Sequence, residues 1–153
     1  MVKLFNDTFN INEIIDSNST EVLLESEFGI ADDMPDIEKL VTAEGKAKLN
    51  NVTVTTDMII VDGRLIYNII YRSNNENYTI HSMSGEIPFR EEIAAEGVTE
   101  DMEALSNIFI DYIDADKLSE RNFLVKAVLI LDTDIYMKRP VTYVSNLESD
   151  GSI

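Results

Sequence analysis

The 153-residue chain contains no cysteine, no tryptophan and one histidine, His81. Without cysteine, the chain cannot form disulfides, thiolate metal sites, iron–sulfur clusters or a cysteine nucleophile. One histidine excludes sites built from several imidazoles, and no Ser-Gly elbow or Asp at motif spacing completes a catalytic triad. The six glycines stand singly, so a glycine-rich phosphate-binding loop is absent. We therefore expect no catalytic residue, no metal and no organic cofactor.

Positive charge is also scarce, because 12 lysines and arginines face 29 aspartates and glutamates, for a net charge of −17. Such a surface repels phosphate backbones and anionic membranes. No window approaches the ~18 apolar residues of a membrane span, and residues 1–12 lack the apolar run of a signal peptide. We expect a cytosolic protein that binds no nucleic acid and has no membrane span.

Hydrophobic residues nevertheless make up 44% of the chain, enough for the core of one domain. Most of them alternate with polar residues, the period of two that predicts half-buried strands. The predicted strands cover 21–30, 57–62, 64–72, 78–87, 108–113, 121–135 and 141–144.

The turns between these strands are predicted from local chemistry. Asp62-Gly63 favours a tight type I′ turn, which predicts that 57–62 and 64–72 form a hairpin. Polar residues at 73–77 predict the next connection, and Gly85 indicates a bulge. Pro88-Phe89 is expected to end a strand or to lie on a sheet edge.

Helical signals are weak. Pro35 followed by the stripe Ile37, Leu40 and Val41 predicts a helix of two turns. We expect a mainly β fold, an antiparallel β-sandwich or open barrel with one or two short helices.

The chain is expected to divide into three parts. Residues 1–20 form an N-terminal arm or short helix, 21–145 a single β domain, and 146–153 a linker-like tail. The tail suggests a fragment of a longer protein.

Section 91–116 is the most acidic of the chain and contains no lysine or arginine. Its Asp114 and Asp116, with Glu120, lack the glycine and twelfth-position glutamate of an EF-hand loop. The section is either a solvated face or a surface that steers a partner, in which case Glu91, Glu92 and Glu96 contribute to binding.

Two tyrosines, Tyr67 and Tyr71, share one strand face. They form either an aromatic platform for a partner or part of the core packing.

Several short segments resemble the SPOCS domain of spore-coat morphogenetic proteins. They are Pro35-Asp36-Ile37, the 58–71 segment with its Val-Asp-Gly, Glu86-Ile87-Pro88-Phe89, and Val125-Lys126-Ala127-Val128. The resemblance spans about residues 30–136. The cysteine-free composition, rich in Asn and Ile, is similar to that of a clostridial coat-anchoring member in which SPOCS repeats precede a LysM domain.

The resemblance implies a scaffold in the mother-cell cytosol that localises the spore coat around the forespore through the ATP-hydrolysing coat basement protein. The family associates that contact with the LysM segment, which has no counterpart in the segments above. It implies no catalytic residues, and the matching positions are structural: Pro35, Asp36, Asp62, Gly63, Tyr71, Pro88 and Phe89.

Three functions remain open. The first is a non-enzymatic assembly module that binds a protein partner through sheet edges or self-associates. The second is a carbohydrate-directed module of the spore envelope, with Asp111 as the acid and Tyr67 and Tyr71 as the stacking platform. The third is a calcium-stabilised domain.

Overall fold

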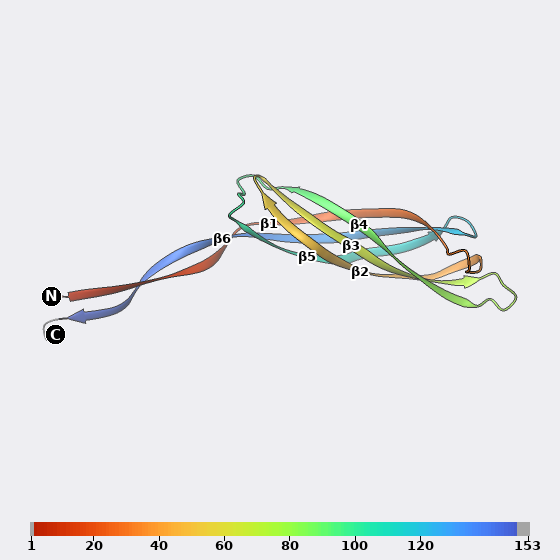
Figure 1. Ribbon diagram of the computed structural model, residues 1–153, viewed down its shortest axis with the longest axis horizontal. Coiled ribbons are helices and arrows are strands. Elements are labelled where there is room, and N and C mark those ends of the chain that lie inside the picture. The colour runs from red at the N-terminus through yellow and green to blue at the C-terminus, as the bar shows by residue number, and fades with distance from the viewer. Residues whose placement is uncertain (1, 150–153) are drawn as a thin grey trace.

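The computed structural model describes the backbone of residues 2–149 and the side chains of residues 10–141. It is an antiparallel sandwich of two three-stranded sheets, in the orders β1-β6-β5 and β2-β3-β4 (Figure 1). This confirms the mainly β prediction. The strands are β1 (Val2–Gly29), β2 (Ile37–Thr55), β3 (Met58–Ser73), β4 (Ile80–Ala94), β5 (Glu103–Lys117) and β6 (Asn122–Ser149).

The core lies between the central strands of the two sheets. Every odd-numbered residue of β3 is buried, and so is every odd-numbered residue of β6 from Phe123 to Ile135. The even-numbered residues of both segments are half-buried or exposed on the outer faces. Each fully buried Ile, Leu or Val contributes about 1.5–3 kcal/mol, so these alternating positions supply most of the stability.

Two aromatic side chains are accommodated by glycines directly opposite them in the β3–β4 pairing. Tyr67 is paired with Gly85, and Phe89 with Gly63. A Cβ at either glycine would collide with the opposing ring. The β3–β4 register is continuous, so the predicted bulge at Gly85 is wrong.

The predicted Asp62-Gly63 turn is also wrong, because β3 runs unbroken through both residues. Alternation continues in phase across them, and Gly63 makes room for Phe89. The hairpin turn lies at Thr56-Asp57 instead, with Asp57 at a φ of 60°. The loop after β4 holds this turn: the amide of Gly97 donates to the Asp57 carboxylate at 2.8 Å.

The predicted helix after Pro35 is a strand, because β2 begins at Ile37. The β2–β3 register shifts between Ile37 and Lys39 and again between Leu40 and Thr42. Each shift inserts one extra residue and changes the phase of the alternation. Apolar residues three apart can therefore face the same core, which explains the misleading helical spacing.

The first strand replaces the arm or short helix predicted for residues 1–20. Between residues 2 and 29 the chain is a strand that pairs with β6 along its whole length, from Val2 opposite Ser149. Because β5 begins opposite Tyr136, the ribbon beyond that point has two strands only and projects from the sandwich (Figure 1). Predicted strand 141–144 and tail residues 146–149 belong to β6. The last four residues, 150–153, lie outside the described residues.

Arg121 fixes the connection that carries the chain from one sheet to the other. Its guanidinium donates to the carbonyls of Ala31 and Met34 at 2.8 and 2.7 Å, and to the Asp36 carboxylate at 3.0 Å. Tyr71 Oη donates to the Pro35 carbonyl in the same connection at 2.9 Å. The loop between the sheets is thus held by side chains rather than by a helix.

Replacing Gly63 by Ala should destabilise the fold by about 1–3 kcal/mol through overpacking. The new Cβ would lie 2.5 Å from Phe89 Cζ and 2.6 Å from the Lys48 carbonyl oxygen. This penalty exceeds the roughly 0.5–1 kcal/mol that Ala gains over Gly in a strand. Urea unfolding of Gly63→Ala measures it, and Phe89→Leu in the same chain should relieve part of it. Gly29→Ala is the control, because its Cβ would meet the flexible Asn122 side chain at 3.2 Å and the Arg121 carbonyl oxygen at an ordinary 3.7 Å. Equal losses at the two glycines would contradict the steric explanation.

Replacing Arg121 by Ala should lower the free energy of unfolding by about 1.5–3 kcal/mol. The guanidinium donates charge-assisted hydrogen bonds, and two of them go to backbone carbonyls. The matched control is Arg139→Ala, which removes an exposed pair with Glu13 at 3.4 Å and should change stability by at most about 0.5 kcal/mol. Chemical denaturation at two salt concentrations measures both. Similar losses would show that Arg121 acts only as a surface charge.

Candidate interaction surface

The tyrosines proposed as an aromatic platform are core residues. Tyr67 is 4% exposed and Tyr71 is fully buried, and burial raises the pKa of both phenols. Tyr67 packs against Phe28 and Phe123, with ring centroids 4.9 and 6.1 Å away. The core-packing interpretation is therefore correct, and the platform interpretation is wrong.

The three predicted glutamates lie toward the β2–β3 turn, whereas Tyr67 is at the middle of β3 and Tyr71 near its other end. Glu91 is half-buried opposite Val61, Glu92 is exposed, and Glu96 is exposed in the loop after β4. Ten residues of β3 separate Val61 from Tyr71, a distance of roughly 33 Å along the strand. The structure does not bring the two groups of predicted residues together.

The other candidate groups are dispersed. Asp111 is exposed at a β5 bulge, and His81 stacks on Tyr71 with ring centroids 5.5 Å apart. Among the described side chains, no three His, Asp or Glu residues gather in a way that could hold a metal ion. Residues 2–149 contain no helix long and apolar enough to cross a membrane.

A cross-strand apolar band lies on the outer face of the β1-β6-β5 sheet. One row joins Leu23, Val128 and Tyr112, and the next contains Ile130 and Phe109. Leu23 is 72% exposed, and Phe109 and Tyr112 are each 50% exposed. We call these five residues the apolar band.

Carboxylates surround the apolar band on both sides along the strands. The outward positions of this face contain two basic side chains among the described residues, Lys126 and Lys138, and Lys138 is paired with Glu103 at 3.7 Å. The face is therefore strongly acidic, and we call it the acidic face. Its carboxylates are Glu21, Glu25, Glu27, Glu103, Asp114, Asp116, Asp132 and Asp134.

Local hydrogen bonds position the polar groups nearest the band. Tyr112 Oη donates to the Asp114 carboxylate at 3.0 Å, and this bond raises the pKa of Tyr112. Lys126 Nζ lies 3.1 Å from the Asp116 carboxylate, which raises the pKa of Lys126. A hollow of about 390 Å³ opens beside them, lined by Leu23, Leu24, Glu25, Tyr112, Lys126, Ala127 and Val128.

The outer face of the other sheet is much richer in basic residues. It contains six of the chain's twelve basic residues, and we call it the basic face. They are Lys39, Lys46, Lys48, Arg64, Arg72 and Arg90, alongside the acidic Glu38, Glu44, Asp62, Glu86 and Glu92, of which Glu38 is paired with Arg72 at 2.7 Å.

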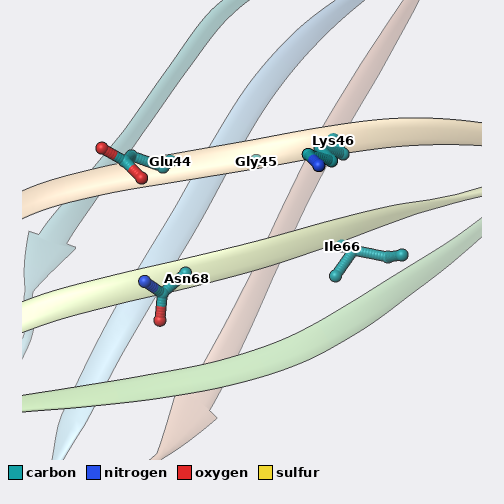
Figure 2. A pocket seen from close by; sticks show the side chains of 5 residues that line it. All are labelled: Glu44, Gly45, Lys46, Ile66 and Asn68. Atoms are coloured by element: carbon teal, nitrogen blue, oxygen red, sulfur yellow. The ribbon is translucent and has the colours of Figure 1, made fainter.

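A hollow of about 230 Å³ lies on the basic face over Gly45. Figure 2 shows Glu44 and Lys46 on β2 and Ile66 and Asn68 on β3 around it. Ile66 offers an apolar contact within an otherwise polar rim.

Sequence reasoning missed the apolar band because of one irregularity. Simple alternation places Phe109 and Tyr112 on opposite faces, but the register shifts between Ile110 and Tyr112, which brings both outward. One signal was available: Val128 and Ile130 are apolar residues at the outward positions of the predicted strand 121–135. A strand that is apolar on both faces is covered on both faces or exposes an apolar patch.

Removing the Asp114 charge should lower the pKa of Tyr112 toward its ordinary value. In the parent, deprotonation of Tyr112 breaks its hydrogen bond to Asp114 and places the phenolate beside the negatively charged carboxylate. The protonated phenol is therefore favoured while Asp114 is charged. NMR titration of ring-labelled tyrosine in Asp114→Asn measures the change, with Asp132→Asn as control. An unchanged Tyr112 titration would contradict the observed bond.

Comparison with known families points to one of them. The family model described as SipL, SPOCS domain, matches residues 36–118, which run from the approach to β2 through β5 and make up more than half of the chain. No curated protein and no solved structure matches the chain. The family is a sporulation-related one and is not known as a family of enzymes. The chain belongs to the SPOCS domain family of SipL.

Proposed function

We propose that this domain is a non-enzymatic assembly module of the spore coat that binds a protein partner through its acidic face. The proposed setting is the mother-cell cytosol at the forespore surface. The proposed partner is another coat morphogenetic protein, such as the ATP-hydrolysing basement-layer protein. The observation that carries the proposal is an exposed apolar band on a member of a sporulation-related family.

The arrangement of the acidic face has the anatomy of a protein interface. Such interfaces combine an apolar centre, rich in aromatic residues, with a polar rim. Here Leu23, Phe109 and Tyr112 are at least half exposed at the centre. The carboxylates at the rim would speed association with a basic surface and select against acidic ones, while most of the affinity comes from the apolar centre.

The carbohydrate alternative is not favoured by any observation. Its stacking platform consisted of Tyr67 and Tyr71, which are buried in the core. Asp111 is exposed on β5 rather than enclosed by apolar side chains. A glycosidase requires two facing carboxylates, one of them in an apolar environment.

Removing the aromatic side chains of the apolar band should abolish partner capture. The test compares the parent with Phe109→Ser/Tyr112→Ser as bait in extracts of sporulating cells, with quantitative mass spectrometry. We expect the double variant to lose its spore-coat partners at least tenfold, because aromatic anchors dominate interface energy. Circular dichroism checks that both baits are folded.

The matched control is Val41→Ser/Ile80→Ser, which removes two apolar side chains that are 55% and 59% exposed on the other sheet. This control should capture the same coat proteins as the parent. Equal capture by all three baits would overturn the proposal. Binding of the parent to a glycan array, lost in the Phe109/Tyr112 variant, would replace it with the carbohydrate function.

A further inference from the structure

The two outer faces of the sandwich are complementary to each other in charge. The acidic face holds eight carboxylates and two lysines, whereas the basic face holds six basic and five acidic side chains. They lie on opposite sides of the molecule, since the sheets meet through their inner faces. The faces can therefore meet only between two molecules.

We propose that the acidic face of one copy docks onto the basic face of the next, so that the domain stacks sheet on sheet into a chain of copies. This inference rests on the proposed function, because it names a second copy as a partner of the same acidic face. Its additional element is the basic face, which the proposed function does not use.

Charged and apolar side chains of the basic face both support a second copy as the partner of the acidic face. Lys46 and Lys48 are exposed, and neither is within 4.0 Å of a carboxylate among the described side chains. They are thus free to face the rim carboxylates of another copy. Between the charged rows of the basic face, the outward side chains of Ile60, Ile66 and Ile70 are available to the apolar band.

The geometry suits sheet packing. Aligned sheets pack about 10 Å apart, which interdigitated side chains of this size can fill. The hollow beside Ile66 can receive a projecting side chain such as Phe109.

The size of the contact indicates a weak association. The relevant part of β6, from Leu124 to Asp134, is roughly 33 Å long, and three strands with side chains are roughly 15 Å wide. The contact would bury about 500 Å² on each copy, or about 1,000 Å² in total, near the lower limit for a specific interface. Stacking should therefore depend on concentration.

The symmetry of the contact determines what forms. An isologous dimer through the acidic face would place eight carboxylates against eight, which is unfavourable. A contact between two different faces is heterologous and leaves one free face at each end. It can therefore continue to a third copy.

Charge reversal on each face tests the proposal. Glu21→Lys/Glu25→Lys reverses part of the acidic face, and Lys46→Glu/Lys48→Glu reverses part of the basic face. Sedimentation velocity of the full chain, from about 10 to 500 μM in low salt, measures self-association. We expect the parent to form growing oligomers that weaken as salt rises, because screening shortens the reach of charge to about 8 Å at 0.15 M. Each variant alone should associate at least tenfold more weakly.

Mixing the two variants gives the decisive measurement. Each retains one unchanged face, so an equimolar mixture should form heterodimers that grow no further. All four substitutions in one chain should not restore oligomers, because both faces then carry more carboxylates than basic side chains. Glu96→Lys/Glu100→Lys, in the loop after β4, changes the net charge as the acidic-face variant does and should leave assembly unchanged.

A parent that stays monomeric over the whole concentration range overturns the stacking proposal. Oligomers that persist in both face variants overturn it as well. Neither result bears on the proposed function, which the capture experiment tests separately. Capture of a basic coat protein by a monomeric parent, lost with Phe109 and Tyr112, would assign the acidic face to that protein.

Discussion

The packing of β3 against β6 is the constraint on which the rest of the structure depends. Each is the central strand of its sheet, so each holds two neighbours by hydrogen bonds while its odd-numbered side chains fill the core. The four outer strands have one paired neighbour each within their sheets. Moving either central strand by one residue would turn its buried side chains outward and detach both neighbours from the core.

The same alternation creates the two outer faces. A strand that buries its odd positions must present its even positions on the other side of the sheet, whatever those residues are. In β6 these include Val128 and Ile130, and in β3 they include Arg64 and Arg72. The chain is strongly acidic in total, yet its basic residues are concentrated where one sheet faces outward. Net charge alone therefore describes this surface poorly.

Sequence patterns predicted strands well where the alternation was unbroken. Segments 64–72 and 121–135 were predicted as strands, and both are the centres of their sheets. The family was also evident from short segments of sequence. The prediction failed where a residue type is required by a contact with a residue distant in the sequence. Gly63 is typical of a tight turn, but in the fold it makes room for the Phe89 ring.

Irregular pairing explains the remaining errors. The β2 register shifts gave Ile37 and Leu40 a helical spacing, and the β5 shift hid the fact that Phe109 and Tyr112 share a face. Such bulges depend on which strand lies alongside, which local sequence does not specify. The roles of Tyr67 and Tyr71 were undecided for a related reason, because alternation shows that two side chains share a face but not whether that face is covered. The candidate surface was thus less predictable than the fold.

The two-stranded ribbon formed by β1 and β6 determines how the domain would respond to mechanical force. Val2 and Ser149 are paired at its tip, and the hydrogen bonds of an antiparallel ribbon run perpendicular to its strands. Pulling these two ends apart would load one pair of bonds at a time, so the ribbon would open like a zipper at low force. It would open without strain on the sandwich until the separation reached Tyr136, where β5 joins the sheet. The ribbon would thus act as an extensible tether in front of a stiffer body.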